Sequence, residues 1–365
     1  MFWYLLNIFI IVVAWLWPVS IYCRDENAYC LYNKIRTKRV CIVGTINWVF
    51  LSGLRSWEIG PDTLAYKLYR FDRTLDRSWS DIFADFILKY KLGEAIKDPG
   101  YPLLEKIFQI FSSDYQLWLI AIAIMFFVPM GIMVYKYSSN AAVSYILFST
   151  LFYSFFAITG HRQTVATAIV VLIGTKFIKE YKLIKFLLLE LVASTIHMSA
   201  LCFLPFYWLS KLKINVKALS LYWIVILVVY FGRNQFFGLL QELIGYEDYV
   251  QTEGARAGAF MYLLILLAVL VTVFYPRFDV ENRITRIAIN ALMISCVFSP
   301  LLLINQSCMR VVQYYSLFLL LLLPDTANIF KEGRSRRLFF FVVSLVMIAL
   351  LMSNSPDYRF CFMQL

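Results

Sequence analysis

Two histidines and one arginine mark places in this sequence where chemistry could occur. His161 and Arg162 follow Gly160, at a point where one apolar run ends and the next begins. That position is typical of a helix N-terminus, where backbone amides and the helix dipole favour an anion. The second histidine, His197, lies inside the apolar run 183–209. A neutral imidazole there can accept a proton from a hydroxyl group, or it can serve only as a hydrogen-bonded packing residue.

Two aspartates occupy turns that open helices in the segment 55–115. Asp62 belongs to a Gly-Pro-Asp-Thr turn, in which the proline fixes the backbone and Asp62 or Thr63 can cap the next helix. Asp98 precedes a Pro-Gly-Tyr sequence and can be a cap in the same way. Either carboxylate can also act as a general base. The catalytic candidates are therefore Asp62, Asp98 and His197, and the pattern does not choose among them.

Three arginines, Arg55, Arg162 and Arg310, fall at predicted helix ends on one face of the membrane. Each could simply extend toward the lipid headgroups. Guanidinium groups also bind phosphate oxygens bidentately and hold their charge without a metal. Three such groups suit a pyrophosphate better than a single carboxylate. We therefore expect all three to bind pyrophosphate, with Arg162 and Arg310 within reach of one diphosphate.

Aromatic and amide side chains accompany these candidates and could bind a sugar or shape the site. Tyr66 falls one helical turn beyond Asp62, and Gln313 shares a helix face with Arg310. The predicted group consists of Tyr66, Tyr101, His161, Gln163 and Gln313. The sequence has no clustered Cys/His ligands and no Gly-rich phosphate loop, and its seven cysteines lack a CxxC spacing. We expect neither a metal nor a cofactor.

The composition predicts that membrane helices position these residues. Hydrophobic residues make up 61% and charged residues 16% of the sequence, against roughly 45–50% and about 25% in soluble domains. With roughly 20 residues per span, the apolar runs predict an all-α, polytopic transmembrane bundle of about 10–12 helices. Residues 1–365 are expected to form a single membrane domain, and the first apolar run lacks the features of a removable signal peptide.

The distribution of lysine and arginine predicts how the helices are oriented. Short basic loops, such as the one that contains Arg24, Lys34 and Arg39, fall on the cytoplasmic side and leave the N-terminus outside. The run 183–209 must then enter and leave at one face. It does so either as two short helices or as a re-entrant hairpin with its apex near His197.

Two longer segments fall on the outer side in this arrangement. Residues 55–115 form a large extracytoplasmic loop, whose patterned sequence predicts order, and residues 232–258 form a second, amphipathic loop that can lie in the interface. The net charge of +11 then belongs to the inner face. It indicates orientation and contact with anionic membrane lipid, not binding of nucleic acid.

Several motifs of this chain, in their order and spacing, resemble the EpsG family of bacterial exopolysaccharide proteins, which are similar to Wzy-type O-antigen polymerases. The resemblance covers roughly residues 40–325. The motifs are GLRSWEIGPDTLAYKLYRF at 53–71, DPGY at 98–101, HRQTVATAI from 161, STIHMSALCFLPFYWL from 194 and RVVQYY from 310. The matching positions include Arg55, Gly60, Asp62, Thr63, Tyr66, Asp98, Gly100, Tyr101, Arg162, Gln163, His197, Ser199 and Arg310.

The resemblance implies a multi-pass protein of the bacterial cytoplasmic membrane. Such a protein joins oligosaccharide repeat units carried on undecaprenyl pyrophosphate, without a metal or a nucleotide sugar, into an exopolysaccharide, capsule or O-antigen chain. Its implied partners are the lipid-linked oligosaccharide, a flippase and a chain-length regulator. In related polymerases and ligases, arginines grip the pyrophosphate while a histidine or an acidic residue assists the acceptor.

Two other functions remain open from the sequence. A membrane glycosyltransferase that uses a polyprenyl monophosphate sugar would also carry an essential aspartate in its first outer loop, and a metal requirement would favour it. A transporter of lipid-linked glycans would instead line a path through the whole membrane with polar groups. The polar residues of this chain gather at one face, with few in the inner half, which favours an enzyme.

Overall fold

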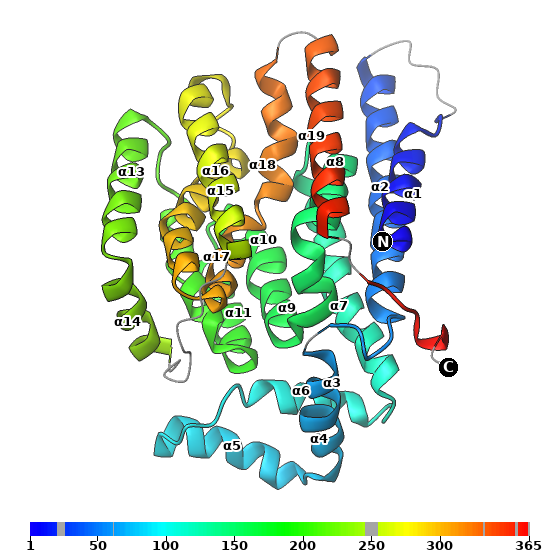
Figure 1. The fold of residues 1–365 in the computed structure, drawn as a ribbon, viewed down its shortest axis with the longest axis vertical. Coiled ribbons are helices and arrows are strands. Elements are labelled where there is room, and N and C mark those ends of the chain that lie inside the picture. The colour runs from blue at the N-terminus through cyan, green and yellow to red at the C-terminus, as the bar shows by residue number, and fades with distance from the viewer. Residues whose placement is uncertain (20–25, 61, 245–254, 331–332, 355–356, 364–365) are drawn as a thin grey trace.

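The computed structural model describes residues 1–19, 26–60, 62–244, 255–330, 333–354 and 357–363. Helices account for 83% of the chain, and the described residues contain no β-strand, only an isolated bridge between Arg55 and Phe360. The all-α class expected from the composition is confirmed. Figure 1 shows most helices running along the long axis of the molecule, with a smaller group lying across one end.

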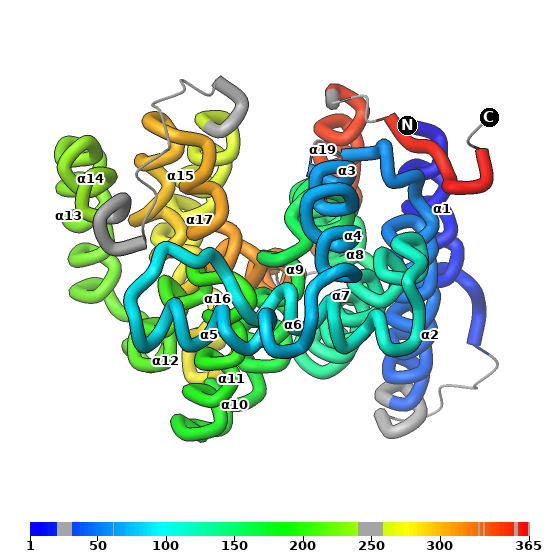
Figure 2. Tube along the Cα trace, turned by 90° about the horizontal axis from the view of Figure 1, so that it is seen from below, coloured from blue at the N-terminus to red at the C-terminus, as the bar shows by residue number. Residues whose placement is uncertain are grey.

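The bundle has two sides joined by a central group of helices (Figure 2). The first side contains α1 (Phe2–Leu16), α2 (Glu26–Gly53), α7 (Tyr115–Tyr137), α8 (Ala141–Leu147) and α19 (Gly333–Asn354). The second contains α13 (Val216–Phe231), α14 (Arg233–Ile244), α15 (Ala255–Phe274), α16 (Arg283–Phe298), α17 (Met309–Ser316) and α18 (Leu319–Thr326). The centre contains α9 (His161–Thr167), α10 (Gly174–Lys179), α11 (Leu183–Ile196) and α12 (Phe206–Leu209).

Short π- and 3₁₀-helical segments interrupt many of the apolar runs. The π-helical segments are η1 (Lys67–Phe71), η2 (Phe148–Phe152), η3 (Ser154–Thr159) and η4 (Ala168–Ile173). The 3₁₀ segments are η5 (Met198–Phe203), η6 (Tyr275–Arg277), η7 (Ser299–Leu303), η8 (Gln306–Cys308), η9 (Ala327–Ile329) and η10 (Cys361–Met363). Such interruptions are frequent where a helix carries function.

Four described helices are long and apolar enough to cross a membrane, and the number rises to six if each of two bent pairs counts as one span. The four are Tyr115–Tyr137, Gly258–Arg277, Arg283–Leu303 and Gly333–Ser353. The bent pairs are Val216–Phe231 with Arg233–Leu239, at 87°, and Gln306–Ser316 with Leu319–Thr326, at 57°. Other apolar runs of the sequence form shorter helices, among them Phe2–Leu16, Ala141–Phe152 and Met198–Leu209. The chain is therefore a multi-pass membrane protein with several segmented helices.

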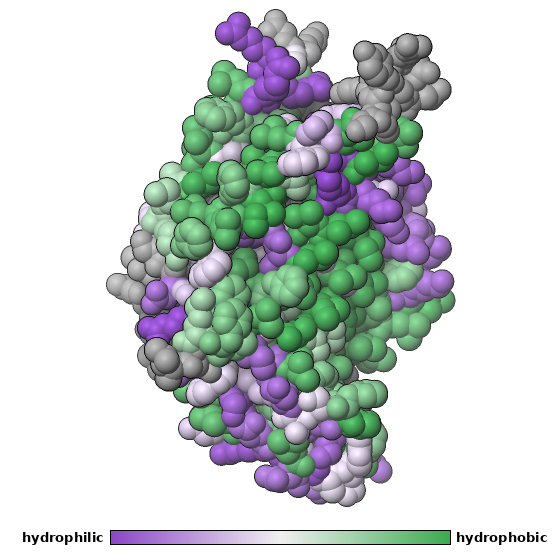
Figure 3. Space-filling model, turned by 90° about the vertical axis from the view of Figure 1, so that its right-hand side faces the viewer, coloured by the Kyte–Doolittle hydropathy of each residue, from purple (hydrophilic) through white to green (hydrophobic). Residues whose placement is uncertain are grey.

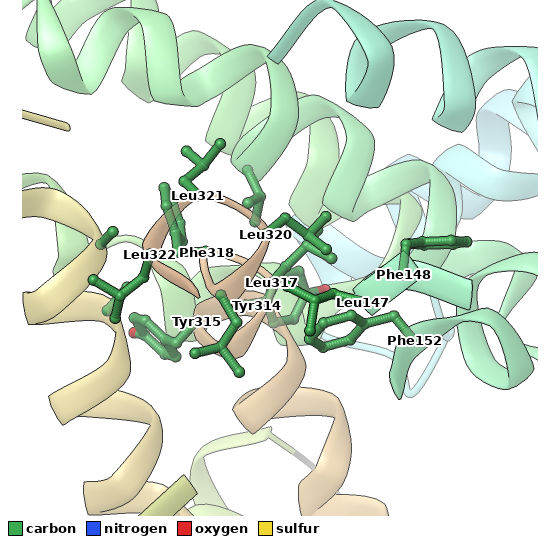
Figure 4. Packing of buried hydrophobic residues seen from close by; sticks show 14 of the residues in the cluster. Leu147, Phe148, Phe152, Tyr314, Tyr315, Leu317, Phe318, Leu320, Leu321 and Leu322 are labelled. Atoms are coloured by element: carbon green, nitrogen blue, oxygen red, sulfur yellow. The ribbon is translucent and has the colours of Figure 1, made fainter. Parts of the chain in front are cut away.

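The hydrophobic exterior fits this conclusion. On the face shown in Figure 3, hydrophobic residues form a broad central area, and hydrophilic residues gather toward the top and the bottom. Inside the bundle, Leu147 of α8 lies beside Leu317, which stands between α17 and α18 (Figure 4). Contacts between α8 and α18 thus join the two sides through one continuous core.

Residues 63–109 fold as a compact cap over one end of the bundle, at the bottom of Figure 1. The cap comprises α3 (Thr63–Tyr66), η1, α4 (Asp72–Asp76), α5 (Trp79–Leu92) and α6 (Gly100–Gln109). Helix α5 begins with a capping box between Ser78 and Asp81 and ends at Gly93, whose φ is 72°. A buried cluster that includes Phe71, Tyr101 and Trp118 attaches the cap to α7. The described residues of 55–115 thus form several helices, and the prediction that this segment is an extracytoplasmic loop stays a prediction.

The second predicted outer loop begins as a helix that bends sharply away from α13. Helix α14 lies toward the end of the bundle that carries the cap, which we call the cap end (Figure 1). Phe236 and Leu239, which were expected to face lipid, are exposed. Residues 245–254 of that predicted loop lie outside the described residues.

The helical run 183–209 breaks at His197, where a break was expected. Helix α11 ends at Ile196, and His197 has an extended backbone with φ −153° and ψ 111°. The chain then continues as η5 and α12, so the run consists of short helical pieces. The break leaves the His197 side chain and the Met198 amide at the end of α11, next to the cap.

Candidate functional site

Asp98 holds together three segments that are far apart in the sequence. Its carboxylate forms an ion pair with Arg162, and its Oδ2 lies 3.2 Å from Nδ1 of His197. The backbone amide of Met198 donates to Oδ1 over 2.9 Å. Asp98 is only 5% exposed, so this group of contacts is shielded from solvent. The structure thus brings together an aspartate, an arginine and a histidine that the sequence predicted separately.

The turn around Asp98 is shaped for this close approach. Asp98 has a φ of 52°, in the left-handed region that aspartate tolerates better than most residues. Two residues later, a Cβ added to Gly100 would lie 2.2 Å from Oγ1 of Thr195. Glycine is therefore required for the start of α6 to pack against the last turn of α11. Asp98 reaches His197 because of that packing.

Arg162 is held in place from a second direction by Tyr66. Its Nε donates to the Tyr66 hydroxyl over 3.1 Å, and its guanidinium carbon lies 5.8 Å from the centre of the Tyr66 ring. The same ring stacks on His161, with centroids 4.6 Å apart and planes at 24°. Tyr101, which is fully buried, packs edge-on against Tyr66 at 5.8 Å. Tyr66 therefore contacts both Arg162 and His161, and Tyr101 packs behind it. Their role in shaping a glycan site stays a prediction.

Arg55 is buried behind His161. Its Nη2 donates to the carbonyl of Ile158 over 3.0 Å and to Nε2 of His161 over 2.8 Å, while Nη1 donates to the carbonyl of Ser52. Because Nε2 of His161 accepts this bond, the proton of the neutral ring is on Nδ1. Arg55 is 2% exposed, and its described hydrogen bonds go to backbone carbonyls, a serine hydroxyl and this imidazole. Through these bonds Arg55 holds residues 158–161, where η3 ends and α9 begins, in place.

Arg310 and Gln163 connect α17 to the same region. Nε2 of Gln163 donates to the carbonyl of Arg310 over 2.6 Å. The positive charges of Arg162 and Arg310 both act on the His197 ring. Next to His197, Ser199 places its hydroxyl 3.1 Å from that of Tyr314. Arg162 reaches this region through Asp98, and Arg310 reaches it through its backbone contact with Gln163. That the two arginines share one diphosphate stays a prediction.

The electrostatics favour a charged Asp98 and an oriented His197. Burial would raise the pKa of the Asp98 carboxyl. The hydrogen bond from His197, the positive charge of Arg162 and the Met198 amide outweigh this effect and hold the pKa below its ordinary value. A carboxylate only accepts hydrogen bonds, so Nδ1 of His197 is the donor and Nε2 carries the lone pair. Nε2 is buried and has no hydrogen-bond partner among the described residues. It is thus available to receive a proton from a substrate hydroxyl.

Two predicted residues do not share these contacts. Asp62 stands at the N-cap of α3 but its side chain makes no capping bond, and the residue is exposed. Thr63, the other predicted cap, donates to the carbonyl of Ile158 over 3.0 Å instead. Gln313 is buried on α17, and its Oε1 has no hydrogen-bond partner in the described part of the chain. The predicted roles of Asp62 and Gln313 stay predictions.

One buried acid near the site was not singled out from the sequence. Glu105 on α6 is 0% exposed and accepts from the Thr74 hydroxyl over 3.1 Å. Its burial raises the pKa of the carboxyl to about 8. In the sequence Glu105 looks like an ordinary polar position of an amphipathic helix, because its burial comes from packing against α4. The described residues contain no group of three or more His, Cys, Asp or Glu side chains that could hold a metal.

Comparison with known proteins identifies the family. No curated protein and no solved structure matches the chain. The model of the EpsG family matches residues 38–363, which include every candidate residue from Arg55 to Gln313. The described break at His197, the Asp98 turn and the start of α9 all fall within the matched region. The chain belongs to the EpsG family.

Proposed function

We propose that this protein is a glycosyltransferase of the polymerase type, which joins oligosaccharide repeat units carried on undecaprenyl pyrophosphate. Membership of the EpsG family suggests a membrane protein of the polysaccharide polymerase type. The observation that carries the proposal is the Asp98–His197 pair beside Arg162 and Arg310. His197 can accept a proton from the acceptor, and the two arginines can bind the pyrophosphate as it leaves.

In the proposed reaction, His197 is the base and Asp98 positions it. An acceptor hydroxyl of one lipid-linked unit attacks the anomeric carbon of the donor chain. The new bond joins the acceptor oxygen to that carbon, and the bond between the carbon and the pyrophosphate oxygen breaks. The hydroxyl proton passes to Nε2 of His197, and the electron pair leaves with the pyrophosphate. Asp98 stabilises the resulting imidazolium, as a buried carboxylate does when it accepts from the other ring nitrogen.

The arginines have two different tasks in this proposal. Arg162 uses Nε and Nη1 for Tyr66 and Asp98, which leaves Nη2 to contact a phosphate oxygen. Arg310 supplies the second charge from α17. Both would stabilise the negative charge that develops on the leaving group. Arg55 is assigned a positioning role, because it is buried and bonds to Ser52, Ile158 and His161.

The alternatives make different use of the same residues. A donor with a single phosphate would need fewer cations around the leaving group. A transporter would instead line a path through the whole membrane with polar groups. The Asp98–His197 pair thus supports an enzyme, and the presence of both Arg162 and Arg310 around it supports a pyrophosphate.

The experiment that tests the proposal is an analysis of lipid-linked intermediates in cells that lack the protein. We expect single repeat units on the lipid pyrophosphate to accumulate, while polymer disappears. Expression of the wild-type chain should restore polymer. Absence of any complete unit would place the protein earlier in the pathway, and unchanged polymer would contradict the proposal.

We also propose that the protein lies in the cytoplasmic membrane with the cap outside. Phe111, beside the cap, is 82% exposed, and Lys213 is exposed in the connection before α13. In a cysteine-free background, Phe111→Cys should react with a membrane-impermeant maleimide added to intact cells, or to spheroplasts if an outer membrane is present. Lys213→Cys should react only after lysis. The opposite pattern would invert the orientation and place the site inside.

A further inference from the structure

A groove lies between α15 and α19, on the segment that leads to the candidate site. Its volume is about 470 Å³, and it is partly open. One wall is formed by Ala259, Phe260 and Leu263 of α15, and the other by Leu350 of α19. Its floor consists of residues of η2 and η3: Thr150, Leu151, Tyr153 and Ser154. The walls are apolar, and hydroxyl groups occur only on the floor.

The groove is connected to the site along two chain segments. The floor segment η3 ends at Thr159, directly before Gly160, His161 and Arg162. The α15 wall begins beside Gly258, where a Cβ would lie 3.5 Å from Leu303 at the end of η7. The chain after η7 passes through η8 to Arg310. Arg162 thus follows the floor of the groove along the chain, and Arg310 follows a segment that packs beside the start of α15.

The deep end of the groove is closed by aromatic packing. Phe260 contacts Phe152 edge-on, with ring centroids 6.4 Å apart. Phe152 is fully buried. One wall of the groove is therefore backed by the apolar core, and its floor segment continues along the chain to His161 and Arg162. An apolar groove whose floor segment is followed by an arginine suits a prenyl chain that carries a pyrophosphate.

We infer that this groove holds the first part of the polyprenyl chain of a lipid pyrophosphate whose head group lies at Arg162 and Arg310. The inference rests on the proposed function for the identity of the head group. An apolar cavity of this size is typical of sites for small ligands, so it holds only a section of a long chain. The rest of the chain extends into the surrounding lipid. The head group of an ordinary phospholipid joins to its glycerol through a single phosphate, whereas a diphosphate can contact both arginines.

A photoreactive polyprenyl pyrophosphate tests the inference without relying on turnover. With the full-length protein in nanodiscs, we expect the probe to label the peptide that contains Ala259 and Leu263. Undecaprenyl pyrophosphate should abolish this labelling, whereas phosphatidylglycerol at the same concentration should not. Labelling that both lipids suppress equally would mean an ordinary lipid site, and labelling only elsewhere would mean a different chain site. Either result overturns the inference.

Groove-filling variants provide the second measurement. Ala259→Trp and Leu263→Trp should lower the preference for a long-chain donor over a short, water-soluble prenyl donor by at least about tenfold, the factor expected from losing burial of about two methylene groups. The activity with each donor is measured for variant and wild type at equal protein abundance. Leu266→Trp, on the exposed side of α15, is the matched control and should keep the wild-type preference. An unchanged preference in both groove variants contradicts the inference.

The two proposals fail in distinguishable ways. If the wild-type protein forms no polymer from lipid-linked units but the probe still labels the groove selectively, the polymerase proposal is wrong and the groove assignment stands. If polymer forms normally and selective labelling is absent, the groove assignment is wrong and the polymerase proposal stands.

Discussion

His197 places Nδ1 3.2 Å from Oδ2 of Asp98, across 99 positions of sequence. This hydrogen bond fixes which ring nitrogen carries the proton, because the carboxylate accepts. The ion pair between Asp98 and Arg162 fixes the carboxylate in turn. The pair therefore connects the proposed base to the proposed leaving-group site. A change at Asp98 should affect both.

Replacement of Asp98 by asparagine tests this connection. Asp98→Asn keeps an acceptor for the Met198 amide but removes the charge that orients His197 and holds Arg162. We expect polymer formation to fall by roughly 10²- to 10⁴-fold, the usual contribution of a positioned base, at near-normal protein abundance. Quantification of polymer against protein in membranes measures it. If the variant retained more than half of the wild-type activity, the Asp98–His197 pair could not be the oriented base of the reaction.

Asp62 gives a comparison within the same cap. The sequence made it a candidate base, and the structure leaves it exposed and without a capping bond. If His197 is the base, Asp62→Asn should keep substantial polymer while His197→Ala loses it. Both variants should be compared at equal abundance in the membrane. Loss of polymer in Asp62→Asn with retention in His197→Ala would transfer the role of base to Asp62.

Arg162 should not tolerate lysine. Its guanidinium group donates to Tyr66, to Asp98 and, in our proposal, to a phosphate oxygen. The ammonium group of a lysine cannot donate to all three partners from one position. We expect Arg162→Lys to lower the rate by at least about tenfold, with a smaller effect from Tyr66→Phe, which removes one bond. Arg73→Lys, at an exposed position of α4, is the matched control. Equal activity of the Arg162 and Arg73 variants would show that the fork geometry is not needed.

Glu105 should make the stability of the protein depend on pH. Its pKa is raised to about 8 by burial, so the folded protein retains a proton that the unfolded chain has lost above about pH 4.5. Stability should therefore fall as pH rises from about 5 to about 8 and level off above that. Glu105→Gln should remove this part of the dependence.

Thermal unfolding of purified wild-type and Glu105→Gln protein between pH 5 and pH 9 measures the effect. Comparison of the two proteins cancels the contribution of other titrating groups. We expect the Tm of the wild type, relative to that of the variant, to decrease by roughly a few degrees over this range. A difference that stays constant or grows in favour of the wild type would contradict the burial of a neutral acid.

Local sequence signals show where helices break, but they do not show which side chains meet. Helix breaks at Gly160 and near His197, and the Asp98 turn, are visible because glycine, proline and polar residues interrupt apolar runs. The contact between Asp98 and His197 depends on Gly100 packing against Thr195, which no local pattern reveals. The contact between Arg55 and the backbone carbonyl of Ile158 cannot be identified from residue types either, and the predicted anion role of Arg55 stays a prediction.

Other features could not be predicted from the sequence for similar reasons. Glu105 is buried against α4, where Thr74, 31 positions away in the sequence, donates a hydrogen bond to it. Its own sequence neighbourhood looks like an ordinary solvated helix face. The π-helical segments η2, η3 and η4 lie inside runs that read as ordinary apolar helices. The fold class followed from composition, whereas the exact course of each span depended on tertiary packing.

The most direct test of the account is a reaction of purified protein with a defined lipid-linked repeat unit. Wild-type protein in nanodiscs is incubated with the unit on undecaprenyl pyrophosphate, and both glycan ladder and released undecaprenyl pyrophosphate are quantified. The account predicts one released lipid pyrophosphate for each new glycosidic bond, and loss of both products in His197→Ala. Polymer formed equally by His197→Ala, or no bond formed by folded wild-type protein, would contradict it.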